Sequence, residues 1–467
     1  MSETNGMIKK PSSLSPIIFF TVVLVAIFLC ISNPGTLHAQ SMPDMRPTDS
    51  LTLALYNNQN WDELIDVGTK AIHQGLDYYY LRIRVGIAWY EKQNFRLAIR
   101  HFEKALKFNP TSQTTIEYLY YSYLLSGRKY DAEKIAPLLS EERKQKIGID
   151  KNQFLDFVYF ETGLGLYLNK NLNKWAKQRQ PKDDSIYKQI VLHENLYYLH
   201  GGINLRVHPG ISTYHGFGDV TVNLRQKTAY LSQPWPDFTT TVHQQEYYGN
   251  AIFAVSNGLK ITSAWHFLWV NYDFRSTRYV DSLYVVVADT VPIKEKEYAA
   301  FLSVRKDLGL LALEACGSYS DFTDSQTKQL GLTIYTYPFG NLNFYTETGI
   351  IKIWNQYERN DWIFRQLLGV KLSSIVWLEA SGTFGNLKDY NEGYAFTVYN
   401  TADDINFKIE GNFLFDISKH LELSLRSRYM QQKAKYFYSP DFETENLEII
   451  NKNYGYFSLI GGIKWKL

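Results

Sequence analysis

Charged residues of both signs alternate with apolar residues along the second half of the chain, and these side chains are the best placed to contact a solute. They comprise Glu314, Glu347, Arg365, Lys371, Glu379, Lys408, Glu410, Glu422, Arg426 and Arg428. A ring of one sign would select ions, whereas mixed signs form salt bridges or line a polar path. The pattern therefore leaves two roles open, structural pairing inside a narrow lumen or a conduit for a neutral polymer.

The sequence gives less support for catalysis than for a polar lumen. The sequence has no His-Glu-x-x-His, no Gly-x-Ser-x-Gly, no cysteine–histidine cluster and no phosphate loop. Five histidines fall in one region, at positions 193, 200, 208, 215 and 243. His215 or His243 with Asp219 is the candidate pair for an outer-membrane hydrolase, which we keep as an alternative. The main prediction is a protein with no enzymatic activity, no catalytic residues, no metal and no cofactor.

The segments that carry these charges are predicted to be β-strands. Between Leu421 and Tyr429 the odd positions are mostly apolar, and the even positions carry Glu422, Arg426 and Arg428. Side chains alternate across a strand, so each segment has one apolar and one polar face. Segments of about 10 residues with aromatic ends fit tilted strands that cross a bilayer. The range 404–467 repeats this pattern three times, which predicts a transmembrane barrel.

Turn signals divide residues 151–467 into hairpins. Short turns are predicted at 208–210, 256–258, 306–307, 338–341, 373–374 and 416–420. The opposite connections are longer and polar, at 170–188, 226–238, 276–293, 387–403 and 436–453. Short turns on one side and long loops on the other are typical of outer-membrane barrels, and we predict about 14 strands, within a range of about 12 to 16. The segment 154–168 is apolar on both faces and reads as a strand or as a linker helix.

The N-terminus predicts export. Lys9 and Lys10 precede an apolar run that ends before a break, and Ala39 provides a small residue for cleavage, so residues 1–39 read as a signal peptide. The formal net charge of +2 gives no argument for nucleic-acid binding. No long apolar run follows the signal, which argues against a helical membrane protein.

Residues 47–150 follow the helical period instead. The range 79–112 matches the tetratricopeptide (TPR) pattern of about 34 residues. Its structural positions are Gly86, Trp89, Phe95, Ala98, Phe102, Ala105 and Pro110. Weaker units flank it, and three units are about the minimum for a stable stack. Such stacks present a concave face to proteins, and the candidate docking residues are Arg82, Tyr90, Tyr118 and Tyr121.

Taken together, the chain resembles outer-membrane proteins of Gram-negative bacteria that carry periplasmic TPR repeats before a C-terminal barrel, including exopolysaccharide-export porins and YaiO-like barrels. The C-terminal spacing of Leu459, Ile463, Trp465 and Leu467 resembles the signal read by the barrel assembly machinery, although it ends on Leu in place of Phe or Trp. The resemblance implies an outer-membrane location with surrounding lipid, and a periplasmic protein partner for the TPR domain.

The predicted fold class is α+β multidomain: a signal peptide (1–39), a short α-helical TPR solenoid (47–150) and an antiparallel transmembrane β-barrel (151–467). The leading functional hypothesis is a conduit or export component with an open lumen, docked to periplasmic machinery, with polysaccharide as the candidate cargo. The alternatives are a non-conducting scaffold or assembly factor in which the TPR domain is the active part, and the hydrolase.

Overall fold

The computed structural model describes residues 45–149, 154–170, 172, 187–230, 233–234, 236–256, 258–280, 285–322, 325–357, 359–439 and 448–467. The predicted signal peptide and most of the predicted loop 170–188 lie outside these residues. Within the described residues, no helix is both long and apolar enough to cross a membrane.

The described chain begins with helices arranged largely in pairs. They are α2 (Met45–Asn57), α3 (Trp61–His73), α4 (Tyr79–Glu91), α5 (Phe95–Phe108), α6 (Gln113–Leu125), α7 (Lys129–Ile135) and α8 (Glu141–Ile147). A Cβ on Gly86 would lie 2.6 Å from the ring of Phe102, so the close approach of α4 and α5 needs a glycine there. The same ring stacks on Tyr118 of α6 at 5.5 Å between centroids, which joins one pair to the next. Pro137 lies in a 3₁₀ turn, Ala136–Leu138, directly after α7.

Fourteen strands of the described residues then close an antiparallel barrel, in agreement with the predicted count. They are β1 (Leu155–Leu168), β2 (Tyr187–His208), β3 (Ile211–Tyr230), β5 (Phe238–Ser256), β6 (Leu259–Val280), β7 (Val285–Asp307), β8 (Leu311–Phe322), β9 (Ser325–Thr336), β10 (Phe344–Asn355), β11 (Asn360–Lys371), β12 (Val376–Phe384), β15 (Asp404–Asp416), β16 (Leu421–Ser439) and β17 (Glu448–Lys466). Closure occurs because β1 pairs with both β2 and β17. The ambiguous segment 154–168 is therefore a strand. The short β4 (Gln233–Pro234) extends one edge of β3.

The two faces of the barrel differ in polarity. On β17, Leu459, Ile463 and Trp465 point outward and are 43%, 50% and 49% exposed, whereas Ser458 beside them is buried. On β9, Leu332 is likewise exposed. This alternation gives the barrel an apolar belt outside and a polar interior, as a barrel in lipid requires.

The wall is much taller on one side than on the other. Strands β2, β3, β6 and β7 have 22, 20, 22 and 23 residues, whereas β8, β9, β10 and β11 have 12 each. A tilted strand needs only about 9–11 residues to cross a bilayer. The tall wall therefore continues well beyond a membrane-spanning belt.

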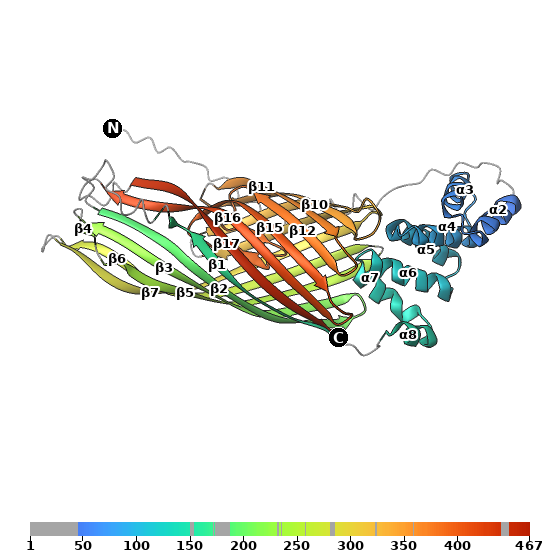
Figure 1. Ribbon diagram of the computed structural model, residues 1–467, viewed down its shortest axis with the longest axis horizontal. Helices are drawn as coiled ribbons and strands as arrows, with labels where there is room; N and C mark the ends of the chain where they lie inside the picture. The colour runs from blue at the N-terminus through green and yellow to red at the C-terminus, as the bar shows by residue number, and fades with distance from the viewer. Residues whose placement is uncertain are drawn as a thin grey trace, which may run out of the picture.

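The helices lie at the end of the barrel where the short turns and the C-terminus are found (Figure 1). Arg96 of α5 is 3% exposed and fixes this junction. Its Nη1 lies 2.8 Å from Oδ1 of Asp307, its Nη2 donates to the carbonyl of Ser126 at 3.0 Å, and its guanidinium stacks 3.4 Å from the Tyr337 ring centre. Burial lowers the pKa of Arg96, and the charge of Asp307 opposes this. The helices are therefore anchored to the rim through a buried charge.

Replacing Arg96 with Leu is expected to loosen this junction, because Asp307 loses its closest partner. We expect a loss of about 2–3 kcal/mol, the usual contribution of charge-assisted hydrogen bonds, measured as a lower midpoint of thermal unfolding at 222 nm in the full-length protein. Lys92→Ala is the matched control, because its ion pair with Asp62 is solvent-exposed and should contribute about 0–1 kcal/mol. Equal effects of the two variants would contradict the anchoring role.

Candidate functional site: a plugged lumen

One connection at the end of the barrel opposite the helices, called the outer end from here on, folds into the lumen. This segment, residues 385–403 between β12 and β15, is called the plug from here on. It contains a small hairpin of β13 (Asn391–Glu392) and β14 (Thr397–Val398). The predicted long connection 387–403 does lie at the end opposite the short turns, but it folds inward, and its side chains and backbone carbonyls contact residues around the barrel. Those residues lie on β2, β5, β6, β7, β8, β9, β11, β12 and β15.

Apolar side chains anchor the root of the plug. Leu387, Tyr390 and Tyr399 are buried in a cluster completed by wall residues of β10, β11, β15, β16 and β17. The rings of Tyr390 and Tyr399 lie parallel at 6.1 Å between centroids. Aromatic rings in the 4.5–7 Å range add about 0.5–1.5 kcal/mol beyond the area they bury. The plug is therefore a packed part of the interior.

A buried carboxylate anchors the hairpin. Glu392 is 7% exposed, and its Oε2 lies 2.6 Å from Nζ of Lys408. The hydroxyl of Tyr399 donates to the same oxygen at 2.8 Å, and Nε of Arg365 lies 3.5 Å from Oε1. A charge removed from water is tolerated only when it is paired and hydrogen-bonded in this way. Lys408 is itself buried, so each member of the pair needs the other.

The tip of the plug has an unusual backbone. Gly393, Tyr394 and Ala395 have φ of 60°, 61° and 62°, a conformation that costs energy for residues with a Cβ. Nδ1 of His266 lies 2.9 Å from the carbonyl oxygen of Ala395, and the hydroxyl of Tyr248 donates to the carbonyl of Tyr394 at 3.3 Å. The wall thus holds the tip in a strained shape.

A chamber of about 440 Å³ lies against the tip and extends towards the helix end of the barrel. Its lining includes the aromatic residues Phe157, Tyr159, Tyr214 and Tyr248. Beside them lies a ladder of ion pairs across β1, β15, β16 and β17: Arg426–Glu161 at 2.8 Å, Arg428–Glu410 at 2.7 Å and Lys464–Glu422 at 2.6 Å. The lining is therefore amphipathic and close to electrically neutral.

The structure places the remaining lumen residues of the sequence analysis in separate groups. Glu314 accepts a hydrogen bond from Tyr335 at 2.8 Å, and Arg365 donates to Glu347 at 3.1 Å. Further groups join Glu379 to Tyr345 and Asn412, and Lys371 to the ring of Trp377. Sequence reasoning missed Glu392, Glu161 and Tyr394. Glu161 stands in the strand with two apolar faces, and a plug residue has no periodic signal.

The histidine candidates lie on the outer face of the wall. Nδ1 of His215 lies 2.8 Å from the hydroxyl of Tyr247, and Thr221 donates to Asp219 at 3.2 Å while lying 3.5 Å from His243. These contacts join the histidines to phenol and threonine hydroxyls rather than to a serine. Among the described residues, no group of three His, Cys, Asp or Glu side chains is placed to hold a metal ion.

The candidate docking residues are engaged within the helices. Arg82 donates to both carboxylate oxygens of Asp77. The rings of Tyr90 and Tyr118 meet edge to face at 5.1 Å, and Tyr121 contacts Tyr120 in the same way. The structure thus brings Tyr90 and Tyr118 together, and it leaves their docking role a prediction.

Fold and site together define a 14-stranded antiparallel barrel, closed by an internal plug and preceded by stacked helices. No family model and no curated protein sequence matches the chain. Among solved structures, a deltaS2 mutant of the monoaromatic hydrocarbon channel TodX shares 8% identity and a TM-score of 0.45, covering 72% of this chain and 94% of its own.

Two further comparisons are weaker. The translocator domain of autotransporter NalP from Neisseria meningitidis shows 10% identity and a TM-score of 0.30 over 70% of this chain and 95% of its own. A point mutant of MamA shows 24% identity and a TM-score of 0.20 over 21% of this chain and 75% of its own. All three scores lie below 0.5, so they assign neither family nor function.

Replacing Glu392 with Gln should free the plug, because Lys408 then stays buried beside only Glu410 at 3.7 Å. Breaking a buried pair costs about 3–5 kcal/mol, and this cost falls on the plug. We expect amide hydrogen exchange across residues 386–400 to accelerate by about a hundredfold or more. The control is Glu422→Gln, whose partners Lys464 and Lys466 do not touch the plug. Unchanged exchange in Glu392→Gln would show that the pair does not hold the plug.

Proposed function

We propose that this protein is a gated conduit of the bacterial outer membrane that serves in export. The observation that carries the proposal is that one loop, held by a buried ion pair, closes a lumen that otherwise contains a polar chamber. Because the plug is a connection between two strands, it could leave the lumen without breaking any rung of the barrel. A barrel closed by side chains of its strands alone would offer no such movement.

The orientation follows from the ends of the barrel. The apolar belt fits lipid, and the end with short turns is the periplasmic end in outer-membrane barrels. The helices lie at that end, which supports a periplasmic location for them (Figure 1). The last strand ends with the exposed apolar residues Ile463, Trp465 and Leu467, a pattern that fits a signal for the barrel assembly machinery.

The chamber supports a neutral polymer, such as a polysaccharide, as cargo. Paired charges cancel each other's long-range fields and still offer donors and acceptors to hydroxyl groups. The aromatic residues offer faces on which sugar rings can pack. The lining carries five basic and four acidic side chains, so a charged solute would find an excess of only one charge.

The helices remain the candidate docking site for a periplasmic partner protein. Stacked helical repeats usually present an extended surface to partners. Tyr121, Tyr118, Tyr90 and Arg82 stay the residues proposed for contact. A partner bound at the rim would be well placed to deliver cargo to the chamber.

The alternative is a non-conducting scaffold in which the helices act and the barrel is an anchor. The dense contacts of the plug favour it, because they would keep the lumen closed permanently.

Single-channel conductance of the purified full-length protein distinguishes the two. We expect wild type to be closed most of the time, Glu392→Gln to open frequently, and a variant with residues 388–403 replaced by a short glycine-serine turn to stay open. Such a turn is feasible because the Leu387 amide already donates to the carbonyl of Ile405 at 2.8 Å. A barrel that stays silent after loss of the plug would leave the scaffold as the function.

A further inference from the structure

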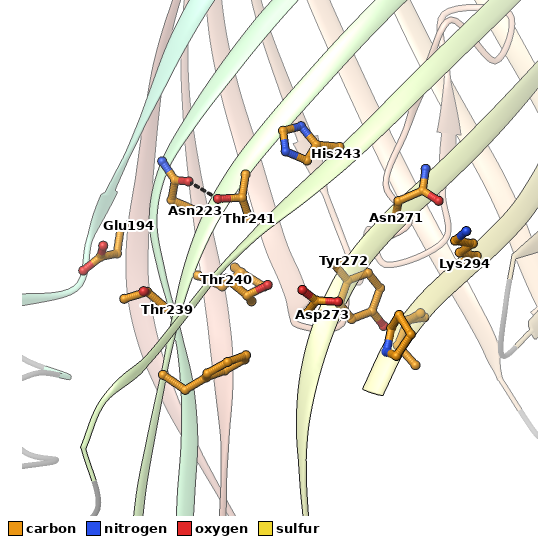
Figure 2. Close-up of a pocket in the computed structure, with 14 residues that line it drawn as sticks. Glu194, Asn223, Thr239, Thr240, Thr241, His243, Asn271, Tyr272, Asp273 and Lys294 are labelled. Carbon is orange, nitrogen blue, oxygen red and sulfur yellow. Dashed lines mark hydrogen bonds between the residues drawn. The ribbon is translucent and has the colours of Figure 1, made fainter. Parts of the chain in front are cut away.

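The barrel wall splits at its outer end between β5 and β6. Their ladder runs from Ser256↔Leu259 to His243↔Asn271 and stops there. Beyond that rung, in the part of the chain that the structure describes, β5 continues to Phe238 in pairing with β3, and β6 continues to Val280 in pairing with β7. Figure 2 shows the segment with Thr239 to Thr241 moving away from the segment with Asn271 to Asp273. Both strands thus extend beyond the ladder that joins them, and in that part their facing backbone edges do not pair with each other.

The outer end of the split is fixed in place. The Arg275 guanidinium of β6 donates to the carbonyl of Pro236 at 3.1 Å and stacks 4.9 Å from the ring centre of Phe238. The Gln226 amide of β3 donates to the carbonyl of Arg275 at 3.0 Å. These bonds bridge the two sides again, so the split is a bounded window in the wall.

A hollow of about 640 Å³ occupies this window. It is lined by residues of β2, β3, β5, β6 and β7, which come from both faces of the alternating wall. Thr240 and Thr241 both line it although neighbouring side chains on a strand point to opposite faces. The volume lies in the range of about 300–1,000 Å³ typical of ligand sites.

The lining contains a group of side chains suited to hydrogen bonding. These amides and hydroxyls belong to Asn223, Asn271, Thr239, Thr240 and Thr241. Thr241 donates to Asn223 at 2.9 Å and Asn223 donates to Asn195 at 2.6 Å, which forms a polar row that leads across the wall to the window. Amides and hydroxyls both donate and accept hydrogen bonds, as a polyhydroxylated ligand requires.

The charges around the hollow are of both signs. Glu194 and Asp273 line it together with Lys294, and Arg225 pairs with Glu194 from the side. The charged residues of the lining are thus two acidic groups and one basic group, so the lining has no excess of positive charge to attract an anion. Phe238 and Tyr272 add aromatic surface.

The hollow lies beyond the apolar belt. His243 stands four residues from Tyr247 and Asn271 stands four residues from Phe267, so each pair shares the outer face of the wall. Tyr247 and Phe267 are outward-facing aromatic residues of the apolar belt. The outward positions become polar at the rung of His243 and Asn271. A wet position of this kind tolerates the unpaired backbone edges that lipid would not.

We propose that this window is a binding site for a neutral saccharide in the barrel wall beyond the apolar belt, separate from the chamber at the plug tip. The sugar hydroxyls take hydrogen bonds from the amide and hydroxyl row, and the aromatic side chains contact the ring faces. The saccharide is either the sugar head group of an outer-leaflet glycolipid or a free glycan chain, since both present the same chemistry.

The first test measures binding of cellohexaose to the full-length protein in a detergent without a sugar head group, by saturation-transfer NMR and calorimetry. We expect binding, and a loss of affinity of about five- to tenfold or more in the double variant Asn223→Leu, Thr241→Val, since each lost neutral hydrogen bond weakens binding a few-fold. Thr348→Val is the matched control, because that hydroxyl bonds Gln366 at 2.8 Å on the low wall, away from the window. Heat-dependent mobility in gel electrophoresis checks that each variant is folded.

Two further binding measurements define the ligand. Oligogalacturonate of the same length should bind at least several-fold more weakly than cellohexaose, because the site has no excess positive charge. Vesicles that contain lipopolysaccharide should compete with cellohexaose if the natural source is the outer-leaflet glycolipid, and should not compete if it is a free chain. Absence of cellohexaose binding, equal binding by the double variant, or preferred binding of the galacturonate would each overturn the proposal.

A second measurement tests the window without a ligand. Cysteines at Thr241 and Asp273 occupy the positions that would face each other if the ladder continued, and cysteines at His243 and Asn271 occupy its last rung. Both are pairs of the same type, because they differ by two residues on each strand. We expect the rung pair to form a disulfide under mild oxidation and the window pair to form it at least about tenfold more slowly, since a disulfide needs Cα atoms within about 7 Å. Equal rates would show that the wall is continuous and would remove the site.

Discussion

The interior of this barrel depends on the pairing of Glu392 with Lys408. Each group is buried, and each would be expensive to bury alone, so the plug and the wall stabilise each other's charge. The pair also fixes the register of the plug hairpin, because Tyr399 and Arg365 can meet Glu392 only in one position of the loop. Apolar packing at the root adds stability, but a slipped loop could still satisfy it. The charge pair is therefore what makes the closure specific.

The unequal height of the wall has a separate consequence. Strands β8 to β12 end near the length that a bilayer needs, while β2 to β7 continue well past it. Twist accumulates along such long strands, and neighbours that are not tied by a closed barrel above the membrane can diverge. The end of the β5–β6 ladder at His243↔Asn271 falls in this region. The tall wall thus carries the window, whereas the plug connects β12 and β15, which are shorter strands.

Much of the fold was predictable from local pattern. Alternation in segments such as 421–429 indicated the strands and their faces, and the turn residues indicated the hairpins at one end. The direction taken by the plug was not predictable, because Asn391, Glu392 and Asn400 have the composition of an exterior loop. Their burial is favourable only when Lys408, Ser318 and Glu297 are already in place on other strands.

The window escaped sequence reasoning for a related reason. On β6, aromatic and polar residues still alternate through Tyr272, Asp273 and Phe274, and on β5 the β-branched residues Thr239 to Thr241 still favour a strand, so neither segment indicates a separation. Whether two neighbours stay paired is a property of the closed wall and of contacts such as Arg275 with Phe238. Local pattern therefore predicts elements well and predicts poorly where they separate.

The junction with the helices and the plug tip are connected by continuous contacts. Arg96 of α5 bonds Asp307, whose Oδ1 also lies 3.7 Å from Arg305. Arg305 donates to the hydroxyl of Tyr337 and stacks 3.9 Å from the ring centre of Tyr335, and Tyr335 donates to Glu314.

Glu314 completes the series, since its Oε2 lies 3.5 Å from the hydroxyl of Tyr394 at the plug tip. A shift of the rim turn therefore changes the surroundings of the tip through a short series of side chains. Because Tyr394 already holds a strained backbone, its conformation depends on those surroundings more than that of a relaxed residue would. The junction with the helices and the plug are in this sense one connected structure, although they stand at different levels of the barrel.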